Sequence, residues 1–189
     1  MLRMDCLRSV YPELERCLVV TIMGAVAAEL QSLGHRPNFF YLQHAMGLAS
    51  STGLGLALCL PAQKIIVFDG DGSLLMNLGS LSTMARYRPG NMVHVVFDNE
   101  SLLSVGGFPT ATATGTDLEG VARAAGIPCA VTVRSVEDFR AAVTAAIQRS
   151  ELTTIIGKVE PRGPSVYITG LGLLENRFQF RGHIASLRK

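Results

Sequence analysis

The sequence predicts an α/β fold: a single doubly wound parallel sheet with helices on both faces. Two observations lead to this prediction. Short apolar runs, typical of buried strands, alternate along the chain with segments that have helical character. Oxygen-bearing side chains also follow directly after two of these runs, at the place where open parallel sheets bind their ligands. No linker or repeat interrupts the alternation, so we expect residues 1–189 to form a single domain.

The first half of the chain is expected to alternate three strands with three helices. Each strand is an apolar run of the length usual for a buried parallel strand, and each helix ends before a glycine or proline that does not continue it. The expected elements are a strand at 17–22, a helix at 24–33 before Gly34, a strand at 39–42, a helix at 47–60 before Pro61, a strand at 65–68 and a helix at 74–87 before Pro89.

The second half continues the same pattern and includes a long loop at 101–116, which is rich in glycine and threonine and is expected to be functional. Two of its helices have side chains that are good N-caps, Asp117 and Ser135. The expected elements are a strand at 93–97, a helix from Asp117 to Ala125, a strand at 129–133, a helix from Ser135 to about residue 150, a strand at 153–159 and a helix at 173–185.

Composition excludes several classes of function. The chain is 48% hydrophobic and 17% charged, which is apolar for an independent domain of 189 residues and favours a protein interface. Its apolar runs are too short to span a membrane. The net charge of +2, without a basic cluster interleaved with aromatic residues, argues against nucleic-acid binding.

The cysteines indicate a reducing compartment. Cys6, Cys17, Cys59 and Cys129 are far apart and form no CxxC pair, so a zinc site is not expected. The last three lie within or beside apolar runs and are expected to be buried thiols. The N-terminal segment also lacks the apolar core of a secretory signal, and we therefore expect a cytoplasmic location.

Two polar motifs carry the functional prediction. Gly70-Asp71-Gly72-Ser73 follows the strand at 65–68, and Asp98-Asn99 follows the next strand along the chain. The carboxyl ends of neighbouring parallel strands share one edge of the sheet, which would bring Asp71 and Asn99 together. A carboxylate and a carboxamide suit a hard cation, and glycines allow a phosphate group to approach the backbone. A helix N-cap and an Asx turn are the ordinary structural interpretations of the two motifs.

Together, the two motifs resemble the diphosphate-binding half of thiamine diphosphate enzymes, whose signature is GDG followed by NN. The resemblance implies a thiamine diphosphate-binding fold, with the cofactor bound through Mg²⁺ and lined by Gly70, Gly72 and Ser73. It implies three metal ligands: the side chains of Asp71 and Asn99 and the backbone carbonyl of Ser101. Asp98 replaces the first Asn of the signature, a position that is not a direct ligand in that pattern.

A third segment, from His44 to Ser51, resembles the GSMGHASS-type stretch of thiamine diphosphate-dependent 2-oxo acid decarboxylases. By this resemblance, Met46 is the apolar residue that wedges between the two rings of the cofactor. The carbonyl of residue 44 would accept a hydrogen bond from the 4′-amino group. The family usually has Gly there, so His44 is a departure that would narrow the site or contact substrate. A core methionine is the alternative interpretation of Met46.

The loop from Ser104 to Thr110 resembles the SVGGQPT stretch of phosphonopyruvate decarboxylases, with Phe108 in place of the usual Gln. Residues 116–127 and 70–81 resemble the related sulfopyruvate decarboxylases. In all, the resemblance covers residues 18–181. Lys158, in a KVEP stretch similar to that of the family, is expected to have a structural role.

The resemblance covers only one of the two half-sites that thiamine diphosphate chemistry needs. The glutamate that activates the cofactor through its pyrimidine ring is therefore expected on a separate pyrimidine-side (alpha) subunit, and no catalytic residue is assigned within this chain. The hypothesis is a subunit of a thiamine diphosphate- and Mg²⁺-dependent decarboxylase. Its substrate would be a small 2-oxo acid, either sulfopyruvate or phosphonopyruvate, which would yield the aldehyde and CO₂.

Three alternatives remain open at this stage. One is another thiamine diphosphate lyase subunit, similar to acetolactate synthase or benzoylformate decarboxylase. The second is half of a 2-oxoacid:ferredoxin oxidoreductase, which the absence of an iron–sulfur cysteine pattern disfavours. The third is a non-catalytic scaffold subunit that kept the fold, which the departures at His44 and Phe108 would support.

Overall fold

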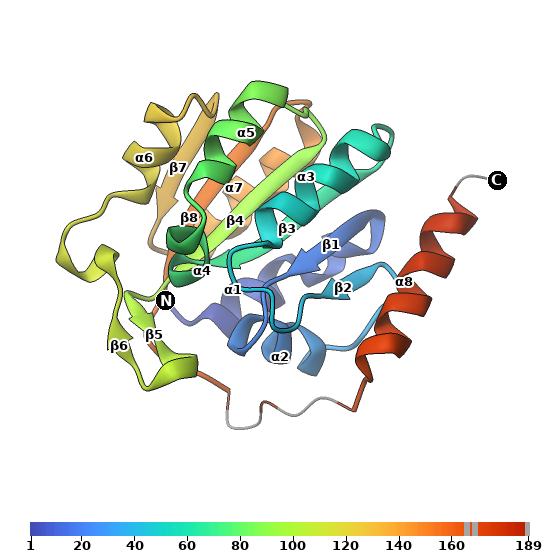
Figure 1. Ribbon diagram of the computed structural model, residues 1–189, viewed down its shortest axis with the longest axis horizontal. Coiled ribbons are helices and arrows are strands. Elements are labelled where there is room, and N and C mark those ends of the chain that lie inside the picture. The colour runs from blue at the N-terminus through green and yellow to red at the C-terminus, as the bar shows by residue number, and fades with distance from the viewer. Residues whose placement is uncertain (165–166, 168–169, 188–189) are drawn as a thin grey trace.

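The computed structural model describes residues 1–164, 167 and 170–187 of the predicted 1–189 domain. A sheet of six strands forms its centre, in the order β2-β1-β3-β4-β8-β7, and all neighbouring strands are parallel (Figure 1). Its strands are β1 (Cys17–Thr21), β2 (Phe39–Tyr41), β3 (Lys64–Gly70), β4 (Met92–Asp98), β7 (Cys129–Val133) and β8 (Thr153–Lys158). The predicted doubly wound parallel sheet is therefore confirmed.

Helices cover both faces of the sheet. One face packs against α1, α2 and α7, and the other packs against α3, α4, α5 and α6, while α8 lies beside the edge strand β2 (Figure 1). The helices are α1 (Arg3–Val10), α2 (Ala25–Ser32), α3 (Ala49–Cys59), α4 (Asp71–Met76), α5 (Gly79–Tyr87), α6 (Leu118–Ala124), α7 (Val136–Gln148) and α8 (Leu173–Ser186).

The central strands are buried on both faces, which explains their continuous apolar sequence. Every residue of β1 and β4 is buried. Towards α7, the rings of Phe68, Phe97 and Phe139 form a continuous stack with centroid distances of 5.8 and 5.6 Å. This packing holds the strands that end at the two polar motifs.

Strands β1 and β3 separate at their carboxyl ends. After β1 the chain turns to α2 on one face, and after β3 it turns to α4 on the other, so the strand order reverses between them. Such a switch point opens a crevice above the sheet, where α/β proteins of this type bind ligands. The Gly70-Asp71-Gly72-Ser73 motif lies at this point.

The predicted helix at 74–87 is instead two helices, α4 and α5. Asn77 leaves helical geometry, with φ −146° and ψ 54°, and its side chain donates a hydrogen bond to the carbonyl of Gly47, 2.9 Å away. A contact distant in sequence therefore interrupts a segment whose apolar pattern is continuous. Helix α1 was not predicted, and the loop at 101–116 contains a small antiparallel hairpin of β5 (Ser101–Leu102) and β6 (Phe108–Pro109).

The predicted N-caps are confirmed, whereas the buried-thiol prediction holds for only one of its three cysteines. Asp117 accepts a hydrogen bond from the backbone N–H of Glu119, and Ser135 accepts one from that of Asp138. Cys17 is buried and Cys129 is half-buried, whereas Cys59 is exposed at the end of α3, because the packed face of that helix is formed by other residues. Within the described ranges, no helix has the length and apolar character needed to cross a membrane.

Helix α8 covers the edge of the sheet through two buried side chains, Asn176 and Phe180. Asn176 accepts a hydrogen bond from the Tyr41 N–H (3.0 Å) and donates one to the Phe39 carbonyl (2.8 Å). Its amide thus satisfies the groups of β2 that a further strand would pair with. Phe180 stacks on Phe40 beside it, with a centroid distance of 5.2 Å.

Replacing Asn176 with Leu is expected to destabilise the fold. The substitution leaves a buried donor and a buried acceptor of β2 unpaired, which costs about 2–4 kcal/mol. Urea denaturation followed by circular dichroism measures the loss, with Glu175→Gln on the exposed side of the same helix as control. An unchanged unfolding midpoint for Asn176→Leu would show that α8 does not secure this edge.

Candidate functional site

The two polar motifs meet at the carboxyl edge of the sheet. Gly70 is paired with Phe97 in the register of β3 and β4, so Asp71 and Asn99 follow directly at neighbouring strand ends. Asp71 is the first residue of α4, and the Asp98–Ser101 segment leads into the β5–β6 hairpin. The fold therefore brings together two motifs that are separated in the sequence by helices α4 and α5 and strand β4.

Asp71 is buried, with 3% of its surface exposed. The hydroxyl of Thr110 donates a hydrogen bond to its Oδ2 at 2.6 Å, and the hydroxyl of Thr112 lies 3.2 Å from the same atom. Burial raises the pKa of the Asp71 carboxyl; the Thr110 hydrogen bond opposes this shift and the nearby charge of Asp98 adds to it. The ionised form of Asp71 is thus costly in this environment and would be favoured by a cation.

Asp98 is also buried, but it has a positively charged partner. Nζ of Lys158, from the end of β8, lies 2.7 Å from Asp98 Oδ2 and 2.7 Å from Glu100 Oε1. The Thr112 hydroxyl lies 2.8 Å from Asp98 Oδ1. Partial burial alone would lower the pKa of Lys158, but its hydrogen bonds to Asp98 and Glu100 outweigh this effect and raise it. The added charge at position 98 is therefore neutralised within the chain.

Asn99 and Ser101 share a tight turn. Oδ1 of Asn99 accepts a hydrogen bond from the Ser101 N–H at 3.1 Å, and Glu100 between them has a positive φ of 59°. An amide oxygen has two acceptor positions, so Asn99 can keep this bond and still face a cation. Together with the buried Asp71 carboxylate, this donor set of hard oxygen atoms fits Mg²⁺.

The turn that carries Met46 is fixed to the start and end of α4. The Gly47 N–H donates to Ser73 Oγ at 3.0 Å, and Asn77 donates to the Gly47 carbonyl at 2.9 Å. Gly47 has φ +87°, and an added Cβ would lie 3.4 Å from the Cβ atoms of Met76 and Asn77, so glycine fits best here. The fold thus joins the segment around Met46 to the Gly70–Ser73 motif.

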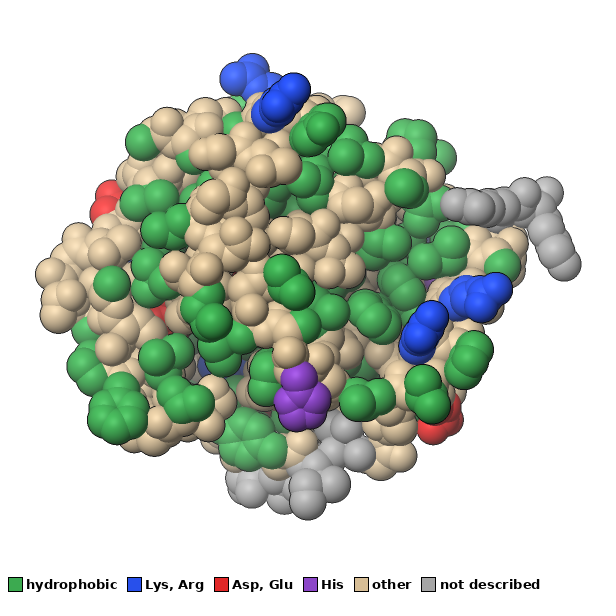
Figure 2. Space-filling view, viewed as in Figure 1, with side chains coloured by type: hydrophobic (Ala, Val, Ile, Leu, Met, Phe, Trp, Pro, Cys, Tyr) green, Lys and Arg blue, Asp and Glu red, His purple; other side chains and the backbone are tan. Residues whose placement is uncertain are grey.

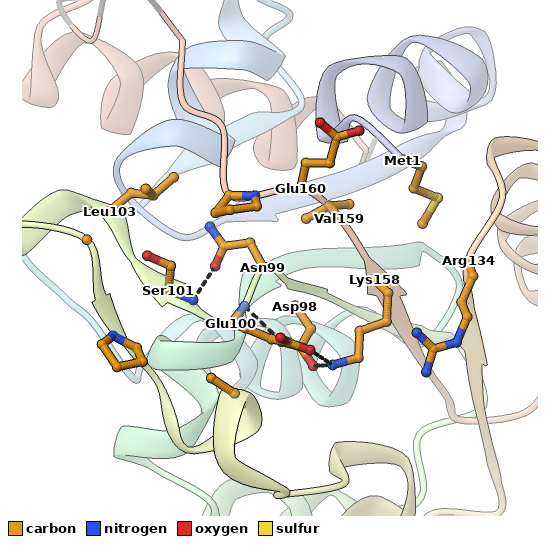
Figure 3. Close-up of a pocket in the computed structure, with 14 residues that line it drawn as sticks. Met1, Asp98, Asn99, Glu100, Ser101, Leu103, Arg134, Lys158, Val159 and Glu160 are labelled. Atoms are coloured by element: carbon orange, nitrogen blue, oxygen red, sulfur yellow. Dashed lines mark hydrogen bonds and ion pairs between the residues drawn. The ribbon is translucent and has the colours of Figure 1, made fainter.

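Two hollows border the predicted residues. The smaller, of about 80 Å³, lies at the switch point and is lined by residues that include Met46, Gly72, Ser73, Ser101 and Gly24. The larger, of about 750 Å³, lies on the other side of the Asp98–Ser101 turn, and Figure 3 shows Asn99, Lys158 and Arg134 around it. Ser101 lines both hollows, and an added Cβ on Gly72 would collide with Leu102 at the smaller one.

His44 lies at the same turn but is exposed, with φ +54°. A positive φ is unusual for a residue other than glycine, which agrees with the glycine that the resembled decarboxylases usually have at this position. The role of its carbonyl in cofactor binding stays a prediction, as do the ligand roles of the remaining residues.

Sequence reasoning missed three residues that organise the site: Thr110 and Thr112 contact Asp71, and Asn77 fixes the Met46 turn. The structural role expected for Lys158 agrees with its pairing to Asp98, but the sequence did not identify that partner. The many threonines of the 101–116 loop were a signal for the first two. Lys158 and Asn77 belong to a strand end and an expected helix, where only the fold shows what they contact.

Comparison with known families is consistent with this geometry. The profile of the thiamine pyrophosphate enzyme C-terminal TPP-binding domain matches residues 22–156. The chain belongs to this family. Helix α8 and the segment before Ile22 lie outside the matched range, whereas all predicted site residues lie within it.

Relatives in this family include decarboxylase subunits. The chain is 39% identical over 160 residues to the sulfopyruvate decarboxylase beta subunit of Methanocaldococcus jannaschii, covering 84% of each chain. It is 38% identical to the phosphonopyruvate decarboxylase of Streptomyces viridochromogenes, covering 84% of this chain but 40% of that protein. The 4-hydroxybenzoylformate decarboxylase of Rhodococcus jostii shares the fold, with a TM-score of 0.72 at 20% identity over 85% of this chain and 33% of that one.

Replacing Lys158 with Met is expected to destabilise the protein, and adding Asp98→Asn is expected to recover most of the loss. The single substitution leaves a buried carboxylate without its cation, which costs about 1–3 kcal/mol for a pair that is partly accessible to water. Urea denaturation measures both variants. Arg162→Met, which breaks the exposed Arg162–Glu160 pair, is the control. Equal losses in the single and double variants would contradict this role of Lys158.

Proposed function

We propose that this chain is the diphosphate-side subunit of a thiamine diphosphate- and Mg²⁺-dependent decarboxylase that acts on a small 2-oxo acid carrying a sulfonate or phosphonate group. Membership of the thiamine pyrophosphate enzyme family and the decarboxylase relatives support the reaction class. Identity of 36–41% to several sulfopyruvate decarboxylase beta subunits supports the substrate class.

The observation that carries the proposal is that the buried carboxylates of Asp98 and Asp71 have different kinds of partner. Asp98 pairs with Lys158, whereas Asp71 contacts the hydroxyls of Thr110 and Thr112. Among the described residues, no ion pair involves Asp71, and its pKa is raised by burial. A divalent cation bound there would supply the missing positive charge, and thus Mg²⁺ fits this position.

The proposed roles follow from this arrangement. Asp71, Asn99 and the Ser101 carbonyl would hold Mg²⁺, while Gly70, Gly72 and Ser73 would line the diphosphate. Met46 would support the cofactor rings, and the His44 carbonyl would accept a hydrogen bond from the 4′-amino group. When bound, thiamine diphosphate supplies the electron sink for cleavage of the bond between the 2-oxo carbon and the carboxylate.

A separate pyrimidine-side subunit would complete the site. Relatives of similar length are named as beta subunits, which implies a partner in those enzymes. Exposed apolar side chains border the turn of Met46: Leu48 is 50% exposed and Met76 is 66% exposed. Figure 2 shows hydrophobic side chains gathered over this face, with the few Lys, Arg, Asp and Glu side chains near its margins. We propose that the partner covers this face and contributes the activating glutamate. A cytoplasmic location stays a prediction.

The substitution Asp71→Asn is expected to abolish Mg²⁺-dependent cofactor binding but to stabilise the unliganded protein at pH 7. A carboxyl whose pKa is raised by folding destabilises the fold above that raised pKa. The penalty disappears below the ordinary carboxyl pKa, where the group is protonated in both states. The stability advantage of the variant should therefore shrink as the pH falls.

Calorimetric titration of thiamine diphosphate with and without Mg²⁺ measures the loss of cofactor binding. Urea denaturation between pH 4 and pH 7 measures the change in stability. Asp117→Asn, at an exposed helix cap, is the matched control. Unchanged Mg²⁺-dependent binding in Asp71→Asn would contradict the assigned metal site.

The substitution Met76→Glu is expected to weaken assembly with the partner at least tenfold, because it places a charge on an apolar face that would be buried. Native mass spectrometry of the tagged chain, purified from its own host in magnesium buffer, measures the fraction in complex. Tyr87→Glu, at the far end of α5 and also exposed, is the control. If only the control loses the complex, or if both variants keep it, the partner does not bind the face around the Met46 turn.

A further inference from the structure

Two buried polar residues, Asp69 and His94, lie directly behind the Gly70–Ser73 motif. Both have 0% of their surface exposed. Asp69 is the penultimate residue of β3, and His94 lies on the neighbouring strand β4, where it is paired in register with Val67. The distance from His94 Nε2 to Asp69 Oδ2 is 3.2 Å. Neither residue belongs to the set proposed to touch the cofactor.

The position of Asp69 coincides with the point where β1 and β3 separate. The last hydrogen bond between these strands runs from the Ile22 N–H to the Phe68 carbonyl at 2.8 Å. The Gly70 N–H points to the same side two residues later, since alternate residues of a parallel strand face the same neighbour. It donates instead to Oδ1 of the adjacent Asp69 at 2.9 Å. The Asp69 side chain thus replaces a backbone acceptor at the start of the crevice.

His94 holds the other oxygen of the same carboxylate. Its Nδ1 makes no hydrogen bond to any residue that the structure describes, so its bond through Nε2 to Asp69 is the one that fixes the ring. Leaving a ring nitrogen lone pair unpaired costs less than leaving an N–H unpaired, which assigns the proton to Nε2 as donor to Asp69. Both oxygens of Asp69 are then held, one by His94 and one by the Gly70 N–H.

An apolar pair would fill this part of the sheet at lower cost. Residues 65–68 of β3 and the residues on either side of His94 in β4 are apolar and buried, and an unexposed polar pair must recover the loss of hydration through hydrogen bonds alone. The benefit is local: the pair fixes the peptide between Asp69 and Gly70, immediately before Asp71 and the first turn of α4.

We propose that His94 is a positioning residue for the Gly70–Ser73 motif, acting through Asp69. The carboxylate orients the Gly70 N–H, and the ring prevents the carboxylate from rotating away. The motif is then presented to the crevice in one conformation before any ligand binds. The nature of the ligand rests on the proposed function, whereas the fixing of the turn does not.

Amide hydrogen exchange measured by NMR on the full chain without ligands tests this role. In His94→Leu and Asp69→Ala, the amides of residues 70–74 should exchange at least tenfold faster, while those of β1 and β7 change little. Asp69→Asn should loosen the turn less than Asp69→Ala, because its Oδ1 still accepts from Gly70. Its amide can donate to His94 only in the tautomer that leaves the Nδ1–H unpaired, so some loosening is expected. Asp69→Asn also provides the test if His94→Leu does not fold.

Val67→Ala is the matched control, since it removes packing on the same face of β3 and leaves both hydrogen bonds intact. If His94→Leu and Asp69→Ala speed exchange evenly over the sheet, as Val67→Ala does, or if Asp69→Asn loosens the turn as much as Asp69→Ala, the positioning role is overturned. Titration of thiamine diphosphate with Mg²⁺ into the partner complex is measured in parallel. If the turn is loosened in the two variants but the wild-type complex binds no cofactor, the proposed function is refuted and the positioning role stands.

Discussion

The structure depends on how negative charge is buried at one edge of the sheet. Asp69 and Asp98 lie at the ends of the adjacent strands β3 and β4, and Asp71 begins the helix that follows β3; each has at most 3% of its surface exposed. A buried carboxylate must be paired or hydrogen-bonded, or it becomes protonated. The chain provides His94 and a backbone N–H for Asp69, and Lys158 for Asp98. Asp71 has no positively charged partner among the described residues, since its hydrogen bonds come from the hydroxyls of Thr110 and Thr112 and from the Gly72 backbone. It is therefore the position where a bound cation would be favoured.

The fold class and the meeting of the two motifs were predictable from sequence, because apolar runs identify buried parallel strands and such strands share one carboxyl edge. The break between α4 and α5 was not, since it depends on the bond between Asn77 and Gly47, two segments joined only by folding. The same limit applies to Lys158, whose partner Asp98 lies on another strand. Sequence analysis thus identifies motifs that are continuous along the chain. It does not identify the contacts between distant segments that hold these motifs in place.

The departure at position 98 illustrates how a family pattern tolerates change. A carboxylate in place of the usual Asn adds negative charge close to Asp71, but Lys158 and Thr112 contact it from two sides. The added negative charge is thus paired within the chain, next to the predicted ligand Asn99. By contrast, His44 and Phe108 are exposed, and nothing within the described chain explains either departure.

The most direct test of this account is a crystal structure of the partner complex grown with thiamine diphosphate and Mn²⁺ in place of Mg²⁺. The anomalous signal of manganese locates the metal without reference to the protein coordinates. The account predicts one strong peak coordinated by Asp71, Asn99 and the Ser101 carbonyl, with the diphosphate beside Gly72 and Ser73. A peak at Asp98 and Glu100, or none at this edge of the sheet, would contradict it.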